Sequence, residues 1–310
     1  MKTRTDLPVQ TGTPASASTP GRKARAPRSR RSGGAASGLF TSLSHVALAV
    51  WALLVVVPIV WTFVAAFKTN AEIFGDAWTL PETWYFDAWG RAWSDANIGR
   101  YLINSVGVVA VSTFLTMLLG AMAAYVLARY EFRGNRVVYF MFVSGMMFPV
   151  FLALVPLFKV VQNLGVHNTY QGLILVYVAY SLPFTIFFLT AFFRTLPTSV
   201  AEAAFIDGAG HVRTFFQIMM PMAKPGLVSI TIFNVIGQWN QYLLPIIIVP
   251  ADQNKWVLPQ AIATISTQAG YEQDWPALMA ALSMAILPVI IVYVIFQRQI
   301  QAGLTAGAVK

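Results

Sequence analysis

The sequence predicts an all-α, polytopic membrane protein, on three observations. Of its 310 residues, 57% are hydrophobic and only 11% are charged, whereas soluble domains carry about 25% charged residues. Six apolar stretches are each long enough to cross a bilayer as a helix, which requires about 20 residues. None of the six has a Lys, Arg, Asp or Glu in its interior. We therefore expect six transmembrane helices.

The expected helices follow a tail of different composition. Residues 1–38 are basic, rich in Pro, Ser, Thr and Gly, and almost free of apolar side chains, so we expect a disordered tail. The apolar run from Leu43 is too long for the core of a signal peptide, which has about 7–15 residues. The remaining chain, 39–310, is expected to form one membrane domain. Its spans are 43–67, 101–128, 137–158, 171–193, 227–249 and 276–296.

The distribution of Lys and Arg predicts the orientation, because these residues favour the cytoplasmic side. With the N-terminus inside, inner segments hold 16 of them and outer segments 5. Without the tail the ratio is still 8 to 5. We expect both termini and the segment 194–226 to lie on the cytoplasmic side of a cell membrane.

Residues 195–227 (TLPTSVAEAAFIDGAGHVRTFFQIMMPMAKPGL) form a polar interruption rich in small residues. Ser199 and Glu202 have the S-x-x-E spacing of a capping box, which predicts the start of a short helix. Gly208 and Gly210 are expected to end that helix, and a second helical run over 215–219 is expected to stop at Pro221. A helix of two turns is marginal alone in water, so we expect it to pack on something else.

The fifth span carries a group of amide side chains. Asn234, Gln238 and Gln241 are spaced so that they share one helix face, with Trp239 and Asn240 beside them. The stripe is interpreted either as part of a substrate path or as hydrogen bonding between helices. Trp239 suits either stacking on a sugar ring or packing inside the bundle.

The chain offers no obvious energy source or catalytic centre of its own. Ion-coupled carriers usually need an ionisable residue deep in the membrane, and there is no G-x-x-x-x-G-K-[ST] phosphate loop. There is no cysteine, and the three histidines lack metal-ligand spacing. We expect no metal, no bound cofactor and no enzymatic activity, and any ATP hydrolysis must occur in a separate subunit.

The segment 195–227 resembles the E-A-A-x-x-x-G-x9-I-x-L-P signature of ABC importer permeases. The residues that match it are Glu202, Ala203, Ala204, Gly208, Ile218 and Pro221, while Met220 stands where the signature prefers Leu. Asp207, Gly208 and Ala209 resemble the D-G-A of the carbohydrate branch. The resemblance covers most of 39–310, and the C-terminal end resembles the second membrane subunit of maltose-type importers. At Gln241 the family usually has an acidic residue.

The resemblance implies the permease subunit of an ATP-driven, binding-protein-dependent importer for a sugar or oligosaccharide in a prokaryotic cell membrane. Its implied partners are a second permease, an ATPase dimer that binds ATP and Mg, and an extracytoplasmic solute-binding protein. An importer for another solute is the alternative, and a self-sufficient carrier or channel is a more remote one.

The resemblance also implies roles for two cytoplasmic segments. The helix around Glu202 to Asp207 would be a coupling helix that docks on the ATPase, with 194–226 as the coupling loop. Glu202 would either pair with a basic ATPase residue as well as cap its helix, or only cap it. The tail 298–310 would also reach the ATPase, the alternative being a frayed end; its residues of interest are Gly303, Thr305, Gly307 and Lys310.

Overall fold

The computed structural model describes residues 34–272 and 274–306, and the side chains of 41–267 and 274–299. The chain divides into two units, 1–54 and 55–310, which are described separately. In the first unit the described part is helix α1 (Gly34–Ala65), which continues into the second unit. Helix α1 begins inside the expected 1–38 tail, and residues 1–33 of that tail lie outside the described residues.

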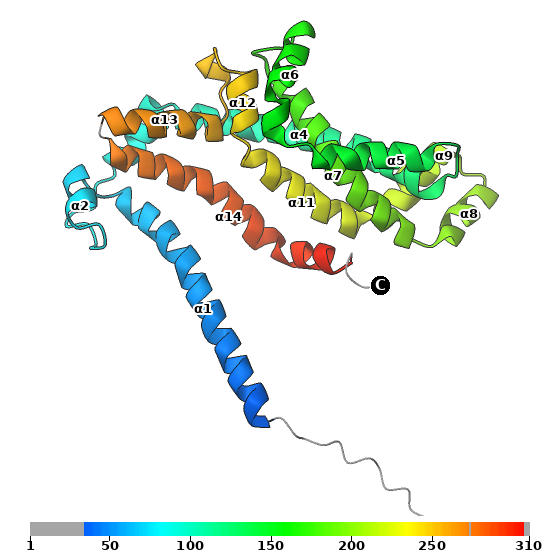
Figure 1. Cartoon of the computed structure of the whole chain (residues 1–310), viewed down its shortest axis with the longest axis horizontal. Coiled ribbons are helices and arrows are strands. Elements are labelled where there is room, and N and C mark those ends of the chain that lie inside the picture. Colours follow the sequence, from blue (N-terminus) through cyan, green and yellow to red (C-terminus); the bar gives the residue numbers. More distant parts are fainter. Residues whose placement is uncertain (1–33, 273, 307–310) are drawn as a thin grey trace, which may run out of the picture. The chain divides into compact units, whose positions relative to one another are not determined.

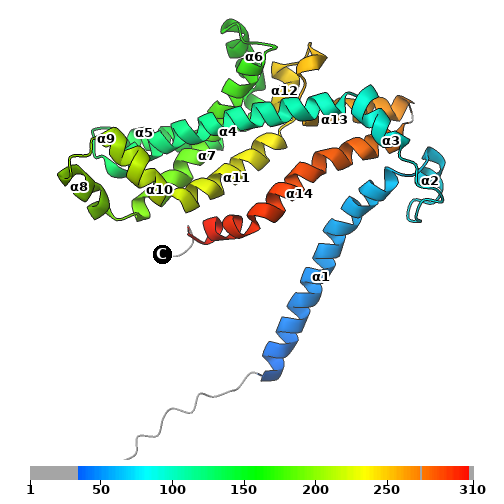
Figure 2. The ribbon, with the colours of Figure 1, turned by 180° about the vertical axis from the view of Figure 1, so that it is seen from behind.

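The second unit is a helical bundle. Helices α4 (Ile98–Arg129), α7 (Tyr170–Thr195) and α11 (Lys224–Trp239) lie side by side, and α14 (Trp275–Ala306) packs against α11 (Figures 1 and 2). A Cβ atom at Gly120 of α4 would lie 2.6 Å from the Thr185 side chain of α7. Glycine is therefore required for the close approach of these two helices.

Four described helices are long and apolar enough to cross a membrane: Thr41–Ala65, Ile98–Arg129, Tyr170–Thr195 and Trp275–Gln299. Two further pairs qualify only as bent units, namely Asn135–Met147 with Val150–Asn163 and His211–Met222 with Lys224–Trp239. The described chain therefore has four to six spans, and the expected third and fifth spans are not simple helices.

The expected third span is broken near its middle. Helix α5 (Asn135–Ser144) passes through a 3₁₀ turn (Gly145–Met147) and is followed by α6 (Val150–Asn163), at an angle of 108°. Phe148 has an extended conformation with ψ of 116°, as expected for a residue that precedes a proline. Pro149 therefore sets the position of the bend.

The expected fifth span, 227–249, is interrupted after Trp239, and the chain resumes as the short helix α12 (Leu243–Ile248). Pro245 has no N–H group to donate to the carbonyl of Gln241 four residues earlier. The hydroxyl of Tyr177 donates to that carbonyl instead, at 3.3 Å. Proline chemistry thus interrupts a run that is continuous in its apolar character.

The segments expected outside the cell meet at one end of the bundle. They contain α2 (Asn70–Gly75), α3 (Asp87–Gly90), a π-helical turn (Arg91–Asp95), a 3₁₀ turn (Gln253–Lys255) and α13 (Leu258–Glu272), the last of which was not expected. Asn104 of α4 donates to the carbonyls of Asn254 and Trp256 at 2.8 and 2.9 Å. Asn168 donates its N–H to Ile248 at 2.8 Å. We call this the α3–α13 end.

The segments expected in the cytoplasm meet at the opposite end, where α8 (Thr198–Ile206) lies near α5 and α9 (His211–Arg213) (Figures 1 and 2). Arg129 donates to the carbonyl of Leu196 at 2.6 Å, and Tyr130 is hydrogen bonded to His211 at 2.8 Å. Successive connections therefore alternate between ends, as the expected topology requires. We call this the α8 end.

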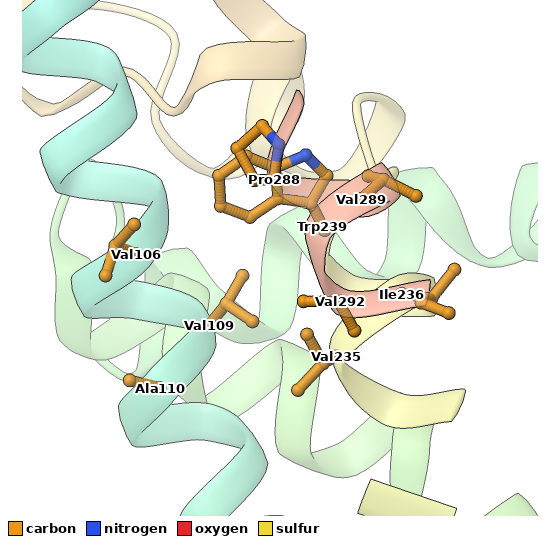
Figure 3. A pocket seen from close by; sticks show the side chains of 9 residues that line it. All are labelled: Val106, Val109, Ala110, Val235, Ile236, Trp239, Pro288, Val289 and Val292. Carbon is orange, nitrogen blue, oxygen red and sulfur yellow. The ribbon is translucent and has the colours of Figure 1, made fainter. Parts of the chain in front are cut away.

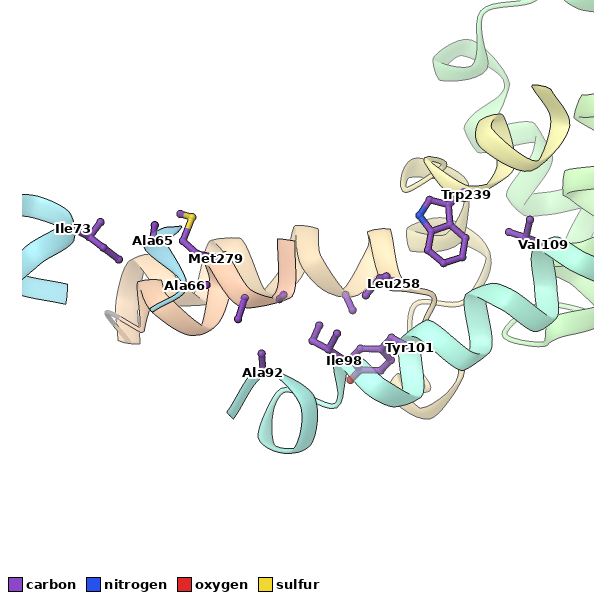
Figure 4. Packing of buried hydrophobic residues seen from close by; sticks show 13 residues of the cluster. Ala65, Ala66, Ile73, Ala92, Ile98, Tyr101, Val109, Trp239, Leu258 and Met279 are labelled. Carbon is purple, nitrogen blue, oxygen red and sulfur yellow. The ribbon is translucent and has the colours of Figure 1, made fainter. Parts of the chain in front are cut away.

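Separate apolar clusters support the two ends. The cluster in Figure 4 joins α4, α13 and α14 at the α3–α13 end and includes Ile98, Tyr101, Leu258 and Trp239. A second cluster at the α8 end is built from Tyr125, Phe193, Phe215 and Met219. Burial of these side chains holds the connections against the ends of the long helices.

Candidate functional site

The start of helix α8 is not the expected capping box. The N-cap is Pro197, with φ of −61° and ψ of 130°, and no side chain caps the helix. Ser199 lies within the first turn, so its hydroxyl is not in the N-cap position that the capping box requires. The capping role expected for Ser199 and Glu202 is therefore wrong.

Glu202 is exposed and forms no hydrogen bond or ion pair within the described part of the chain. Both interpretations of this residue included capping. Since α8 does not use its carboxylate, the side chain is available to a group outside this chain.

The C-terminal end of α8 is made by backbone hydrogen bonds. Gly208 has φ of +82°, its N–H donates to the carbonyl of Phe205 at 3.1 Å, and the N–H of Ala209 donates to Ala204 at 2.9 Å. These two bonds define a Schellman motif. Asp207 is the C-cap. The expected stop at Gly208 is confirmed, while Gly210, with φ of −71°, instead precedes the next helix.

Helix α8 has a buried and an exposed face. Ala201 and Ala204 are 8% and 5% exposed, so Ala204 packs on this chain's own core and is not free to contact a partner. Ala203 and Glu202 lie on the exposed face. Ile206 is 86% exposed. The sequence interpretation did not single it out, although an apolar residue in a short helix within a polar segment is a signal for an exposed contact residue.

The helical run 211–222 does not stop at Pro221. It contains α9, a π-helical stretch (Thr214–Met219) and α10 (Met220–Met222), and then turns by 79° at Ala223 into α11. Pro221 is exposed and is the second residue of α10, in a first helical turn where the missing N–H of proline is tolerated. Ile218 packs on the cluster at the α8 end.

The amide side chains of α11 fall into two groups. Asn234 and Gln238 are 4% and 6% exposed. Asn234 donates to the Thr185 hydroxyl of α7 at 2.8 Å. Gln238 accepts from Ser112 of α4 at 2.5 Å and donates to Ser181 of α7 at 2.9 Å. For these two residues the contacts favour hydrogen bonding between helices over a lining role.

Asn240 and Gln241 lie at the break after α11 and make local contacts. The Asn240 amide donates to the carbonyl of Ile236 in its own helix at 2.9 Å. The Gln241 side chain accepts from the N–H of Leu243 at 3.2 Å. Asn240 and its neighbour Tyr242 are exposed, so polar groups available to a ligand occur at this break.

Trp239 connects α11 to α14. Its indole nitrogen donates to the carbonyl of Ala285 at 3.3 Å, in the turn of α14 before Pro288. Trp239 borders an apolar cavity of about 260 Å³ between α4, α11 and α14, together with Val109 and Pro288 (Figure 3). It also borders a second cavity of about 420 Å³ with Asn240 and Tyr242.

The remaining sequence-predicted residues lie at the C-terminal end of the chain. Gly303 and Thr305 belong to α14, but their side chains lie outside the described ones, as do Gly307 and Lys310 entirely. Within the described residues no group of three or more His, Cys, Asp or Glu is arranged to hold a metal ion.

Comparison with known proteins gives a consistent result. Residues 116–305 match the family described as "Binding-protein-dependent transport system inner membrane component". The chain is 50% identical over 271 residues to the diacetylchitobiose uptake system permease protein NgcG of Streptomyces coelicolor, covering 87% of this chain and 89% of that protein. It is 36% identical over 253 residues to the trehalose transport system permease protein SugB of Mycobacterium tuberculosis, covering 82% and 92%.

A solved structure has the same fold. A chain of a bacterial ABC transporter involved in the import of alginate matches with a TM-score of 0.74 and 24% identity, over 85% of this chain and 97% of that one. The importer-permease bundle expected from the sequence is therefore confirmed as a fold.

Proposed function

Since this chain belongs to the family of binding-protein-dependent transport system inner membrane components, we propose that it is the permease subunit of an ATP-driven importer for a sugar or oligosaccharide. The related proteins named above carry diacetylchitobiose and trehalose in their names. A chitobiose-type disaccharide is the first substrate to test, because the relative named for it shares half of the aligned residues.

The observation that carries the proposal is the geometry of α8. This helix is anchored at both ends, by the bond from Arg129 to Leu196 and by the Schellman motif at Gly208, yet it presents Glu202 and Ile206 outward. A helix held in place but exposing an unpaired carboxylate and an apolar side chain suits docking on another protein. The proposed partner is an ATPase subunit, with α8 as the coupling helix.

The other partners and the location follow from the same proposal. A second permease completes the membrane pathway, a dimer of ATPase subunits holds ATP and Mg, and an extracytoplasmic binding protein delivers the sugar. The α8 end lies on the cytoplasmic side of a prokaryotic plasma membrane. We propose that the tail 298–310 also contacts the ATPase.

The proposed substrate contacts lie at the break after α11. Asn234 and Gln238 already satisfy hydroxyl groups of α4 and α7, so replacing those bonds would cost free energy. Asn240 and Tyr242 are exposed beside the second cavity of Trp239. Polar groups next to an aromatic ring suit a hydroxylated sugar.

The test is uptake of radiolabelled N,N′-diacetylchitobiose, trehalose and a labelled amino acid by cells with the gene intact, deleted or restored. We expect deletion to abolish uptake of one sugar and restoration to return it, with amino acid uptake unchanged. Sugar uptake that is unaffected by deletion, or a loss confined to the amino acid, would contradict the proposed sugar importer.

A further inference from the structure

Three arginine side chains border one cavity at the α8 end, of about 640 Å³. Arg129 ends α4, Arg136 lies in the first turn of α5, and Arg194 lies in the last turn of α7. None of the three forms an ion pair among the described residues. The Glu131 carboxylate also borders the cavity and is likewise outside any ion pair, so the site keeps an excess of positive charge.

Arg129 is the most constrained of the three. One terminal nitrogen of its guanidinium donates to Leu196, whereas its Nε atom is buried without a hydrogen-bond partner. A buried donor left unpaired costs about 1–3 kcal/mol, which an acceptor in the cavity would remove. Charged guanidinium groups form their strongest hydrogen bonds with carboxylates and phosphates.

The first turns of two helices border the same cavity, through Asn135 and Arg136 of α5 and Thr198 of α8. Neither helix has a side-chain cap. The unpaired N–H groups of a helix start favour an anion. These helix ends add to the positive electrostatic potential that the arginine side chains create in the cavity.

A second hollow, of about 500 Å³, continues from Arg136 and Val137 along α5 past Phe140 and Met141. Val137 and Met141 are 72% and 63% exposed. The Arg136 guanidinium lies 5.8 Å from the centre of the Phe140 ring, at the junction of the two hollows. The surface thus offers a cationic cavity joined to an apolar groove on a membrane helix.

We propose that this surface binds an anionic phospholipid, with the phosphate among Arg129, Arg136 and Arg194 and an acyl chain along α5. A soluble phosphate would match the cavity but leave the groove unused, whereas a phospholipid matches both. Because Arg129 also holds the carbonyl of Leu196, the bound lipid stabilises the junction that leads into α8. This proposal requires only that the chain lies in a membrane and is independent of the transported solute.

The test uses the full chain, purified in detergent with the subunits with which it assembles. Dioleoylphosphatidylglycerol, dioleoylphosphatidylcholine and glycerol 3-phosphate are titrated in turn, and the midpoint of thermal unfolding is recorded. We expect the anionic lipid alone to raise the midpoint, with saturation. A comparable rise with the zwitterionic lipid, or with glycerol 3-phosphate, would overturn the proposal of a phospholipid site.

The variants are Arg136→Gln, Arg194→Gln, their combination and Arg133→Gln. Arg133 is exposed in the same loop but does not border the cavity, so it controls for general charge. We expect the concentration of anionic lipid at half effect to rise about fivefold for each single variant and roughly 30-fold for the double variant. It should stay unchanged in Arg133→Gln. Equal effects of Arg133→Gln and Arg136→Gln would overturn the proposed site. If the double variant fails to assemble, the comparison of the single variants with Arg133→Gln still decides the result.

Discussion

Ser112 of α4 donates a hydrogen bond of 2.5 Å to the side-chain oxygen of Gln238 in α11. Thr113 donates to the same oxygen at 3.0 Å, and the Gln238 nitrogen donates to Ser181 of α7 at 2.9 Å. One amide therefore joins three helices in the middle of the bundle. Gln238 therefore has a structural role, since its amide holds the three helices together.

Replacing Gln238 with leucine should destabilise the bundle. The substitution keeps most of the volume but leaves the hydroxyl of Thr113 without its partner, at a cost of about 1–2 kcal/mol. The midpoint of thermal unfolding in detergent measures the effect. Asn240→Ala is the matched control, because the Asn240 amide is exposed and bonds only within its own helix. Equal midpoints for the two variants would refute the structural role.

Replacing Trp239 with phenylalanine should remove the link to Ala285 while an aromatic ring remains. The loss of that hydrogen bond should cost about 1 kcal/mol, and Trp239→Ala should cost about 3–5 kcal/mol by joining two cavities. Thermal unfolding again provides the measurement, with Trp84→Phe as the control at a side chain that is 50% exposed. A Trp239→Phe variant as stable as this control would show that the bond is without consequence.

Replacing Gly208 with valine should leave the bundle folded but displace α8. No atom lies within 4 Å of the position of a Cβ at Gly208, so the penalty comes from its φ of +82°. A left-handed conformation costs about 1–2 kcal/mol for other residues, which lowers the population of the native turn about 5- to 30-fold.

The readout for Gly208→Val is the ratio of transport to ATP hydrolysis in the reconstituted importer, which we expect to fall. Asparagine tolerates the left-handed region, so Gly208→Asn should retain more coupling. Gly210→Ala is the second control, since Gly210 has φ of −71° and equally open surroundings. Normal coupling in Gly208→Val would exclude the proposed role of this turn.

Replacing Glu202 with glutamine now tests contact with a partner alone, because the carboxylate caps nothing in α8. We expect unchanged unfolding of the isolated chain and weaker assembly with the ATPase, by about 0.2–1 kcal/mol if the partner's cation is solvent-exposed. The dissociation constant of the complex at two salt concentrations is the measurement, and Ser199→Ala is the control. Identical binding by both variants would remove Glu202 from the interface.

Acid should weaken the α3–α13 end through Asp274. Hydrogen bonds from Arg91, at 2.9 and 3.1 Å, hold the pKa of this carboxyl below its ordinary value of 3.8. Stability from the pair is fully present above about pH 4 and is lost as pH falls through the lowered pKa. Unfolding midpoints of the wild type and Asp274→Asn should therefore differ at pH 7, and the difference should shrink as the pH falls below 3.8. A constant difference across this range would contradict the assignment.

The sequence predicted the long helices because apolar length is a direct consequence of crossing a bilayer. It did not reveal the break at Pro149 or the break that precedes Pro245, since the residues around both prolines remain apolar and length alone does not report direction. Helix α13 was missed because it lies in a segment read as a loop between spans. Composition thus predicted which segments are membrane helices, and local backbone chemistry decided where they bend.

The candidate site was predicted unevenly for a similar reason. Gly208 was identified because its role depends on its own backbone, whereas the S-x-x-E pattern failed because Pro197 already occupies the N-cap. The spacing of Asn234 and Gln238 showed that they share a face, but their partners Thr185 and Ser181 belong to another helix. Hydrogen-bond partners that lie far apart in the sequence cannot be identified from the spacing of residues within one sequence.

The stop of α8 at Gly208 has a consequence for the evolution and engineering of such assemblies. Backbone hydrogen bonds terminate the helix. The outward side chains of Glu202 and Ile206 are therefore not needed to end it. They can be exchanged for those of another system while the frame from Leu196 to Ala209 is kept. With α8 as the proposed coupling helix, such a graft would direct the subunit to the ATPase of that other system.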